Sequence, residues 1–136
     1  MKNLFYFLIV GFLLLLSCNR DDETQVNKVA GEWKLIQSKT YVQNSNGQYE
    51  LQTTDYSSQN IIYNFQMNNQ LKITGSQNDG ILPYEFKNDY LGGNADSGKI
   101  DFVQIQSTKY VFSLNGNQLS LDNKYVDGPE LIFQKK

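Results

Sequence analysis

Residues 61–66, with the sequence Ile-Ile-Tyr-Asn-Phe-Gln, indicate most clearly which fold this chain adopts. Apolar Ile61, Tyr63 and Phe65 occupy every second position and alternate with polar residues such as Asn64. A period of two is typical of a β-strand that is buried on one face only. Branched and aromatic side chains also fit a pleated strand well. This stretch therefore predicts a strand with an apolar inner face and a polar outer face.

Turn sequences on both sides of this strand divide the chain into further segments of the same kind. Asn and Gly accept the positive backbone φ angles of tight turns, and turn sequences occur at Asn46-Gly47, Met67-Asn68-Asn69, Asp79-Gly80, Asn115-Gly116 and Asp127-Gly128. The alternating apolar positions between them are Trp33 and Leu35 with Gln37 next in phase, Tyr49 and Leu51, Leu71 and Ile73, Leu82, Tyr84 and Phe86, Ile100 and Phe102, Phe112 and Leu114, Leu119 and Leu121, and Leu131 and Phe133. One helical turn is expected near Val26 and Val29.

These segments predict an all-β domain of eight or nine short strands over residues 31–136, with no long helix. Successive hairpins that each carry one apolar face are typical of an up-and-down antiparallel meander. Closure of the meander into a small β-barrel of about eight strands would remove the exposed strand edges that promote aggregation. A two-sheet sandwich fits the same alternation and remains the second possibility.

The first 18 residues are organised like a secretory signal. Lys2 precedes a 13-residue apolar run, Leu4 to Leu16, and the small residue Ser17 stands before Cys18, the only cysteine. A positive charge, an apolar core and a small-residue cleavage site in this order are typical of secreted proteins. The run is shorter than the roughly 20 apolar residues that a membrane-spanning helix needs. Acylation would give the single thiol a role, and a half-cystine or an uncleaved anchor are the alternatives.

Leu15-Leu16-Ser17-Cys18 resembles the lipobox of bacterial lipoproteins. The resemblance implies a signal peptide at residues 1–17, cleavage before Cys18, and a diacylglyceryl group on its sulfur that holds the protein on a membrane. The next stretch, Asn19-Arg20-Asp21-Asp22-Glu23, resembles the signal that directs lipoproteins of Bacteroidota to the outer face of the outer membrane. Residues 18–30 would then be a lipidated polar tether. The protein would face the cell surface, with the periplasm as the alternative.

Size and charge narrow the class of protein further. Cleavage before Cys18 would leave 119 of the 136 residues, enough for one domain with a sizeable core. It would remove one of the 12 basic residues and none of the 14 acidic residues, for a net charge of −3. This balance predicts no basic surface for nucleic acid. We expect a monomer.

The opening of the predicted barrel, Gly31-Glu32-Trp33-Lys34-Leu35, resembles the Gly-Xaa-Trp signature of lipocalins and of bacterial lipocalin-like lipoproteins. Further likenesses to the bacterial set extend over residues 30–135 and include Tyr63-Asn64-Phe65, Leu71-Lys72-Ile73, Tyr84-Glu85-Phe86 and residues 110–119. The resemblance implies a small barrel that binds a ligand. Lipocalins usually pack a late arginine across the Trp ring, whereas this chain has no arginine after Arg20. The residues that could replace it by a cation–π contact are Lys124, Lys135 and Lys136.

Catalytic chemistry finds little support in this composition. The chain contains no histidine, which removes the usual general base near neutral pH and the commonest metal ligand. We therefore expect no enzyme, no metal site and no cofactor. Glu85 and Asp101 are a candidate carboxylate pair for glycosidase-type chemistry, but the alternation predicts both on the face opposite the aromatic residues. Asn94-Ala95-Asp96-Ser97-Gly98 with Asp101 offers oxygen ligands for calcium without the terminal acid of a standard loop, so an ordinary turn is favoured.

The residues left to carry a function are aromatic side chains on the predicted inner face. The candidate ligand-binding residues are Trp33, Tyr63, Phe65, Tyr84, Phe86, Phe102 and Phe112, and Phe133 joins them on that face. As a pocket they would bind a small hydrophobic or amphipathic ligand, oriented by tyrosine hydroxyls. As a core they would fill the barrel, with Trp33 plugging one end. The protein would then be a structural or interaction lipoprotein that presents loops such as Thr53–Asn60 and Leu91–Gly98 to another component of the cell envelope.

Overall fold

The alternating segments of the sequence all form strands in the computed structural model, which describes residues 26–92 and 98–136. Over these residues the strands are β1 (Gly31–Gln43), β2 (Tyr49–Asp55), β3 (Ile62–Phe65), β4 (Gln70–Thr74), β5 (Gly80–Asp89), β6 (Ile100–Ile105), β7 (Thr108–Asn115), β8 (Gln118–Asp122) and β9 (Glu130–Lys135). One turn of 3-10 helix, Lys124–Val126, lies between β8 and β9. The predicted all-β class is confirmed.

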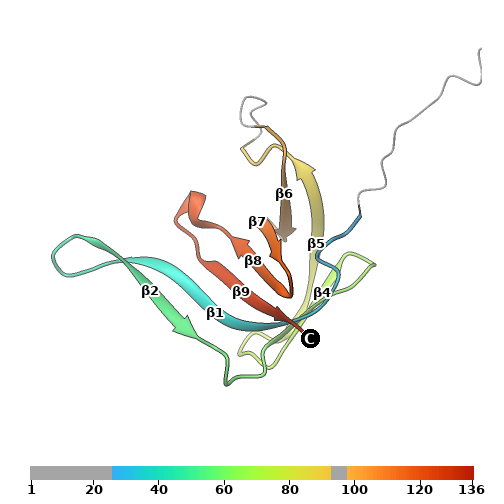
Figure 1. Cartoon of the computed structure of the whole chain (residues 1–136), viewed down its shortest axis with the longest axis horizontal. Helices are drawn as coiled ribbons and strands as arrows, with labels where there is room; N and C mark the ends of the chain where they lie inside the picture. Colours follow the sequence, from blue (N-terminus) through green and yellow to red (C-terminus); the bar gives the residue numbers. More distant parts are fainter. Residues whose placement is uncertain (1–25, 93–97) are drawn as a thin grey trace, which may run out of the picture.

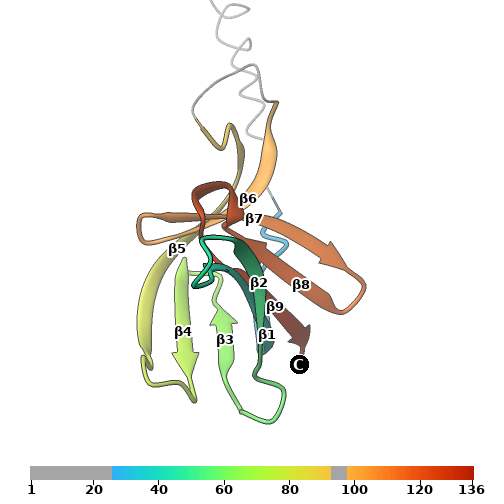
Figure 2. The ribbon, with the colours of Figure 1, turned by 90° about the vertical axis from the view of Figure 1, so that its left-hand side faces the viewer.

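β1 closes the sheet into a barrel because it pairs along both of its edges. Its residues Gly31–Lys34 pair with β3, and its residues Trp33–Lys39 pair with β9. From β3 onward each strand pairs with the next in sequence, always antiparallel. Figure 2 shows β3, β4 and β5 side by side along one wall. The predicted up-and-down barrel is therefore confirmed, with β1 and β3–β9 in the closed ring, and the sandwich is not the fold.

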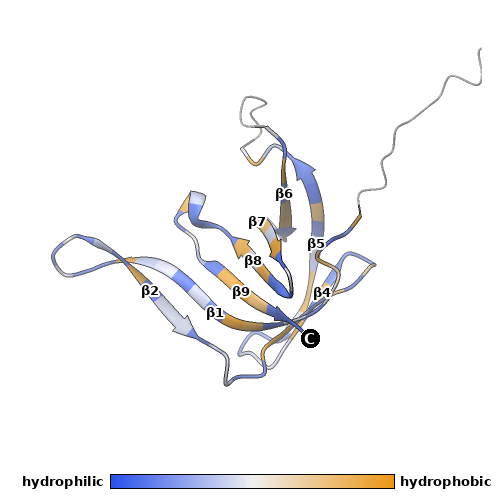
Figure 3. Cartoon of the chain, viewed as in Figure 1, coloured by the Kyte–Doolittle hydropathy of each residue, from blue (hydrophilic) through white to orange (hydrophobic). Residues whose placement is uncertain are grey.

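β2 lies outside the ring and extends β1 away from the barrel. It pairs only with the second half of β1, from Gln37 to Gln43, and the resulting hairpin projects from the barrel in Figure 1. Every residue of β2 is exposed. Figure 3 shows β2 as mostly pale or blue, whereas orange, apolar segments lie along the barrel strands. We refer to residues 40–55 as the arm.

Aromatic side chains from successive strands fill the barrel, as the alternation predicts. Three pairs of rings meet edge to face, with ring centres 5.0 Å apart for Tyr63–Phe133, 5.0 Å for Phe65–Tyr84 and 5.1 Å for Phe86–Phe112. This geometry adds a favourable quadrupole interaction to the burial of the rings. The described core cluster runs from Val29 to Phe133. The segment that follows Cys18 therefore contains this whole core, and we expect it to fold by itself.

Phe102 is the exception, and the expectation that it faces the interior is wrong. Phe86 pairs with Val103 across β5 and β6, and Val103 is fully buried in the core. Phe102 therefore points to the opposite face of β6, where it is buried outside the core cluster with Lys109 Nζ 5.1 Å from its ring centre. β6 carries apolar residues in both phases, so its alternation does not identify its inner face.

A β-bulge in β1 overturns a second expectation. The pairing of β1 with β9 is regular up to Leu35 and resumes at Gln37, which leaves Ile36 as an extra residue. One extra residue reverses the face of every later side chain. Gln37, predicted to continue the inner phase of Leu35, therefore faces outward, and Ser38 and Thr40 take the inner positions.

Two turns differ from the sequence-based expectation. The turn between β6 and β7, at Gln106-Ser107, carries no Gly, Asn or Pro, and Gln106 itself takes a φ of 54°. The Gln106 N–H donates to the carbonyl oxygen of Pro83 at 3.0 Å. Before β1, the expected helical turn is a single hydrogen-bonded turn, in which the Ala30 N–H donates to the Asn27 carbonyl oxygen at 3.3 Å. The first turn is thus tied to a distant residue, whereas the second is closed by a local hydrogen bond.

Candidate functional site

Trp33 fills the end of the barrel where β1 begins. Its side chain is 2% exposed, and its indole N–H donates a 2.7 Å hydrogen bond to the carbonyl oxygen of Val29, which is fully buried. Lys135, from the last strand, covers the ring with its Nζ 4.2 Å from the ring centre. A cation at this distance is attracted by the ring quadrupole. Trp33 therefore plugs this filled end as predicted, and Lys135 makes the contact for which three lysines were candidates.

Gly31 makes room for this contact. Its φ of 121° lies in a region that L-residues with a side chain rarely adopt. A Cβ at this position would also lie 2.6 Å from Lys135 Nζ. The same Nζ donates to the carbonyl oxygen of Ala30 at 3.3 Å. The glycine of the Gly-Xaa-Trp sequence therefore leaves space for the lysine that covers the tryptophan.

The segment before β1 is tied to the filled end by polar contacts. Asn27 Nδ2 donates to the Tyr84 hydroxyl at 2.8 Å, and that hydroxyl donates to the carbonyl oxygen of Gln66 at 2.7 Å. Lys28 Nζ lies 2.7 Å from a carboxylate oxygen of Asp101. The hydrogen bond from Lys28 lowers the pKa of the Asp101 carboxyl. These groups hold the segment across the barrel and leave the Tyr84 hydroxyl occupied.

Glu85 and Asp101 do not form a carboxylate pair. Asp101 lies on the face of β6 that also carries the core residue Val103. Glu85 lies on the outer face of β5, where it forms an ion pair with Lys87. The prediction that both acids share the outward face is wrong for Asp101. Val103, and not Phe102, marks the inner face of β6, so Asp101 lies on the inner face. The two carboxylates therefore cannot flank one sugar bond.

A groove opens at the other end of the barrel, beyond the bulge in β1. Its volume is about 760 Å³, within the roughly 300–1,000 Å³ that is typical of small-molecule sites. Three loops surround it, at residues 56–61, 75–79 and 123–129. The lining residues come from these loops and from β1, β3, β4 and β9, and they include Leu35, Ser38, Thr40, Tyr56, Gln59, Ile61, Tyr63, Ile73, Gly75, Ser76, Gln77, Asn78, Pro129 and Leu131.

None of these lining side chains is charged at neutral pH. Leu35, Ile61, Ile73 and Leu131 provide an apolar surface. The other side chains are mainly hydroxyls and carboxamides, which both donate and accept hydrogen bonds. An apolar surface with a few neutral polar groups is suited to binding an amphipathic small molecule.

Two tyrosine hydroxyls in the groove are available to a ligand. The hydroxyls of Tyr56 and Tyr63 make no hydrogen bond with any residue that the structure describes, and neither is sealed from solvent. Burial raises the pKa of the Tyr63 phenol above its ordinary value, and the nearby phenols of Tyr110 and Tyr56 raise it further. Tyr63 is therefore a neutral hydroxyl at physiological pH and can donate or accept a hydrogen bond.

An aspartate just outside the groove braces each of two flanking loops. Asp55 accepts a hydrogen bond from the Ser57 N–H at 2.8 Å. Asp79 accepts from the N–H groups of Ser76 at 2.7 Å and Gly75 at 3.1 Å. These backbone hydrogen bonds lower the pKa of both carboxyl groups. Both carboxylates thus stabilise the loops, and neither lines the groove.

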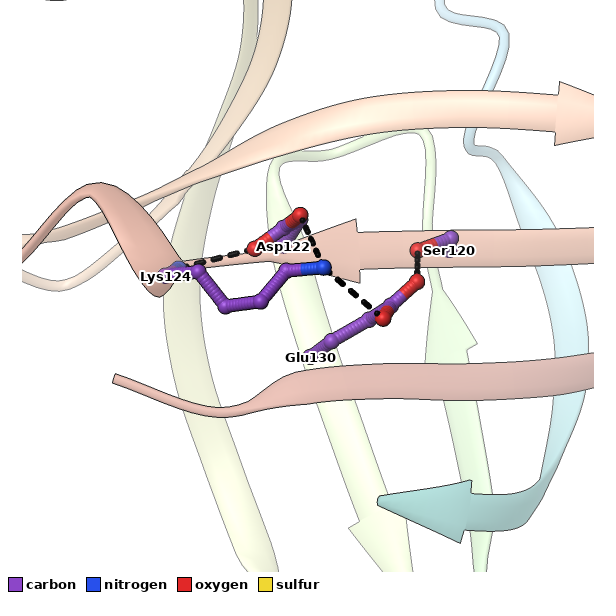
Figure 4. Close-up of polar contacts among 4 residues, drawn as sticks. All are labelled: Ser120, Asp122, Lys124 and Glu130. Atoms are coloured by element: carbon purple, nitrogen blue, oxygen red, sulfur yellow. Dashed lines mark hydrogen bonds and ion pairs between the residues drawn. The ribbon is translucent and has the colours of Figure 1, made fainter. Parts of the chain in front are cut away.

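The third loop is held by a polar network between β8 and β9 (Figure 4). Lys124 Nζ lies 3.0 Å from Asp122 and 3.1 Å from Glu130, and the Ser120 hydroxyl donates to Glu130 at 2.8 Å. The Lys124 backbone N–H also donates to Asp122, at 2.7 Å. The hydrogen bonds with these two carboxylates raise the pKa of the Lys124 ammonium. The network fixes both ends of the loop whose Pro129 lines the groove.

Two of the three loops touch at Gly75. Its φ is 80°, and a Cβ there would collide with the carbonyl oxygen of Asn60 in the neighbouring loop. A side chain at this position would therefore strain the turn and push the two loops apart. The glycine sets the spacing of the loops on this side of the groove.

Tyr63 is the predicted ligand-binding residue that lines this groove. The other predicted residues lie elsewhere: Trp33, Phe65 and Tyr84 are at most 2% exposed within the core, Phe86 and Phe112 pack on each other half-buried, and Phe102 lies outside the core cluster. Sequence reasoning missed the groove residues Ser38, Thr40, Gln59 and Ser76. Short polar residues in loops carry no periodicity, and only the bulge turns Ser38 and Thr40 inward.

Several sequence-based predictions fall outside the described residues. They are the signal peptide at residues 1–17, the lipidation site Cys18, the charged stretch at residues 19–23 and most of the candidate calcium loop at residues 94–98. Within residues 26–92 and 98–136, no group of three or more Cys, Asp or Glu side chains is placed to hold a metal ion. No helix in this part of the chain has the length and apolar character needed to cross a membrane.

The fold and the groove define a small antiparallel β-barrel with one filled end and one grooved end. Comparison of the chain with models of protein families, with curated proteins and with solved structures finds no match. The barrel is compatible with a lipocalin-like fold, and the family itself remains a prediction from the residues quoted above.

Proposed function

We propose that this protein is an extracytoplasmic lipoprotein, held on the outer membrane by a diacylglyceryl group on Cys18, whose lipocalin-like barrel binds a small hydrophobic or amphipathic ligand. The groove is the observation that supports the binding function most directly. It offers about 760 Å³, an apolar surface and the hydroxyls of Tyr56 and Tyr63, which bond to none of the described residues. The mouth of a β-barrel is also a preferred position for a ligand pocket. The binding requires neither a cofactor nor covalent chemistry.

The anchor is supported by sequence alone. Lys2, the apolar run and Ser17 stand in the order of a secretory signal, directly before the single cysteine. Each buried methylene of an acyl chain contributes about 0.8 kcal/mol to membrane binding, and two chains hold a protein stably where one does not. The acidic stretch after Cys18 favours the cell-surface side of the outer membrane.

Native mass spectrometry tests the binding function. The segment 19–136, which contains the whole described core, would be secreted from a host of the same envelope type and purified without detergent. We expect a complex whose mass exceeds that of the chain by one small molecule, and release of that molecule into organic solvent. A variant with Tyr63→Phe and Ser38→Val, both in the groove, should retain less of it. A chain that carries no ligand and binds none from a lipid extract would contradict the function.

Labelling with radioactive palmitate tests the anchor. The full chain is expected to incorporate label and to fractionate with membranes. Cys18→Ala should abolish both, whereas Ser17→Ala, which keeps a small residue before the cysteine, should preserve both. Equal incorporation by the wild-type chain and the Cys18→Ala variant would exclude this cysteine as the site of acylation.

A filled-barrel interaction protein is the second candidate function. Two observations favour it: the predicted interior aromatics Trp33, Phe65 and Tyr84 are inaccessible core residues, and the arm carries the exposed apolar side chains of Tyr41, Tyr49 and Leu51. In that case the arm and loops would contact another envelope component, and the groove would hold only water. Pull-down from envelope extracts with the wild-type segment and with an arm variant (Tyr41→Ser with Tyr49→Ser) distinguishes the two. Loss of a partner with the arm variant, together with an empty groove, would support this second function.

A further inference from the structure

We propose that the groove selects a ligand with an uncharged, hydroxyl-bearing head and an aliphatic tail, of the monoacylglycerol type. This assignment rests on the proposed binding function and narrows it to one class of amphiphile. It follows from the chemistry of the lining, the position of the nearest carboxylates and the division of the groove into apolar and polar surfaces.

The lining offers nothing to neutralise an anionic head. None of the 14 described residues around the groove is basic. Lys34 donates from its Nζ to the carbonyl oxygen of Ser57 at 2.8 Å in the adjacent loop, and its side chain is not part of the lining. An ionised carboxylate loses hydration in such a site and gains no partner, which is costly. Asp55 and Asp79 beside the groove would repel it as well.

A cationic head also lacks a direct partner. Among the residues that the structure describes, no acidic side chain lines the groove. The carboxylates of Asp55 and Asp79 accept backbone hydrogen bonds that hold the two loops. A cation bound in the groove would therefore rely on the faces of Tyr56 and Tyr63, and exposed cation–π contacts supply only about 0.5–1 kcal/mol.

A neutral head with hydroxyl groups matches the polar part of the lining. Ser38, Thr40, Tyr56 and Tyr63 present hydroxyls, and Gln59 adds a carboxamide. These groups donate and accept at once, as the hydroxyls of a glycerol or a sugar do. A ligand that lacks such groups would leave the tyrosine hydroxyls without partners, which weakens binding.

The aliphatic tail follows from the deeper lining. Leu35, Ile61 and Ile73 are buried members of the core cluster that also line the groove. They carry the apolar surface from the groove to the interior of the barrel. A tail laid against them removes apolar area from water, which contributes about 25 cal/mol per Å².

Three ligands with the same 12-carbon tail test this assignment. The segment 19–136 would be titrated calorimetrically with 1-monolauroylglycerol, laurate and dodecyltrimethylammonium, each below its micelle concentration. We expect the glycerol ester to bind at least about tenfold more tightly than either ion. Equal or tighter binding of laurate or of the ammonium would overturn the neutral-head assignment and leave the binding function standing. Binding of none of the three, with no retained molecule in native mass spectrometry, would overturn both.

A charge placed in the groove tests the assignment, and the same charge placed in the arm is the matched control. Gln59→Lys introduces an ammonium at an exposed lining position, and Gln48→Lys introduces the same charge in the turn of the arm. We expect Gln59→Lys to raise the affinity for laurate relative to the glycerol ester by about threefold or more. Gln48→Lys should leave the ratio unchanged. An unchanged ratio in a folded Gln59→Lys variant, as judged by circular dichroism, would place the ligand outside the groove and overturn the assignment.

Discussion

The two ends of this barrel are built from the same alternating strands and carry different side chains. At the filled end, Trp33 is buried beneath Lys135 and beside Val29, and every polar group of the indole is satisfied. At the groove end, the hydroxyls of Tyr56 and Tyr63 make no hydrogen bond with a described residue and lie above an apolar surface. The loops there are held by carboxylates that lie outside the groove. The filled end therefore stabilises the fold, and the groove end presents a surface to which a ligand can bind.

The two ends are recognised from different kinds of residue. The filled end is recognised by large aromatic residues, because the alternation along the strands predicts which of them face the interior. Small polar residues mark the candidate site, because they line space that the aromatic rings leave unfilled. A search of the sequence for conspicuous residues therefore finds the core before it finds the site. The following five predictions test this contrast, in order of decreasing expected effect on the molecule.

Truncation of the core near the filled end should have the largest effect. Phe65→Ala removes a ring that is 1% exposed and packed against Tyr84. We expect a loss of about 3–5 kcal/mol in the free energy of unfolding, measured by urea denaturation. Tyr56→Ala, which truncates a half-buried side chain at the groove end, should lower the free energy of unfolding by clearly less. Equal losses from the two truncations would contradict the contrast between the ends.

Gly75→Ala should disturb the groove end more than its exposure suggests. The new Cβ would collide with the carbonyl oxygen of Asn60 and strain a residue with φ of 80°, at a cost of about 1–3 kcal/mol. Gly116→Ala is the matched control, because Gly116 has φ of 58° and no neighbour within 4 Å. The loss of stability in Gly75→Ala beyond that in Gly116→Ala would measure the contact between the two loops, and ligand binding should weaken with it. No excess would show that the two loops separate freely.

Loss of the lysine over Trp33 should have a modest effect. Lys135→Met keeps the aliphatic stem and removes the cation, and we expect a loss of about 0.5–1 kcal/mol. Lys136→Met removes a neighbouring exposed charge and should be close to neutral. Because Trp33 is the only tryptophan, its fluorescence should shift in the first variant and not in the second. A matching shift in both variants would indicate a general charge effect.

Tyr63→Phe should separate binding from stability. The hydroxyl makes no hydrogen bond with a described residue, so its removal should change the free energy of unfolding by less than about 0.5 kcal/mol. If the hydroxyl binds the head of a ligand, affinity should fall by about twofold to tenfold, which corresponds to one neutral hydrogen bond. Calorimetric titration with 1-monolauroylglycerol measures the change. Unaltered affinity would remove Tyr63 from the site.

The response to pH should be small across the neutral range, with a loss of stability in acid. The pKa values of Asp55 and Asp79 are lowered by backbone hydrogen bonds from their ordinary value of 3.8. Their contribution to loop stability is therefore complete above that value and is lost as the pH falls through the lower, folded-state pKa values. We expect thermal unfolding and ligand affinity to be flat from pH 5 to pH 8 and to decline below about pH 3.8.

A matched pair of variants checks the acid response. In the Asp79→Asn variant, the fall in stability at acid pH should be smaller, because the amide does not titrate. Asp127→Asn removes an exposed carboxylate that accepts no hydrogen bond from a described residue, and it should leave the decline unchanged. A midpoint between pH 5 and pH 8 in the wild type would contradict the assignment, since the chain has no histidine.

Much of the fold could be predicted because its signals are local. The alternation around Tyr63 and Phe65 placed β3, and Asn-Gly at residues 46–47 and 115–116 placed two hairpin turns. The turn at Gln106-Ser107 could not be predicted in the same way, because it has no Gly, Asn or Pro, and a glutamine takes the positive φ and bonds to distant Pro83. The inner face of β6 was also ambiguous, so Phe102 was assigned to the wrong side.

The candidate site was far less predictable than the fold. Tyr63 was found because it is aromatic and in phase. Ser38 and Thr40 were missed because their inward direction depends on the bulge at Ile36, and a bulge is defined by pairing with a partner strand. The residues of the three loops meet only when the barrel closes.

The strand content, the positions of most turns and many of the buried aromatic residues follow from the sequence, since alternation and turn chemistry act over a few neighbouring residues. The pairing of β1 on both edges, the filled end and the uncharged groove arise only when the barrel closes. Those features depend on which strands become neighbours and on the space their side chains leave. No short stretch of sequence contains that information.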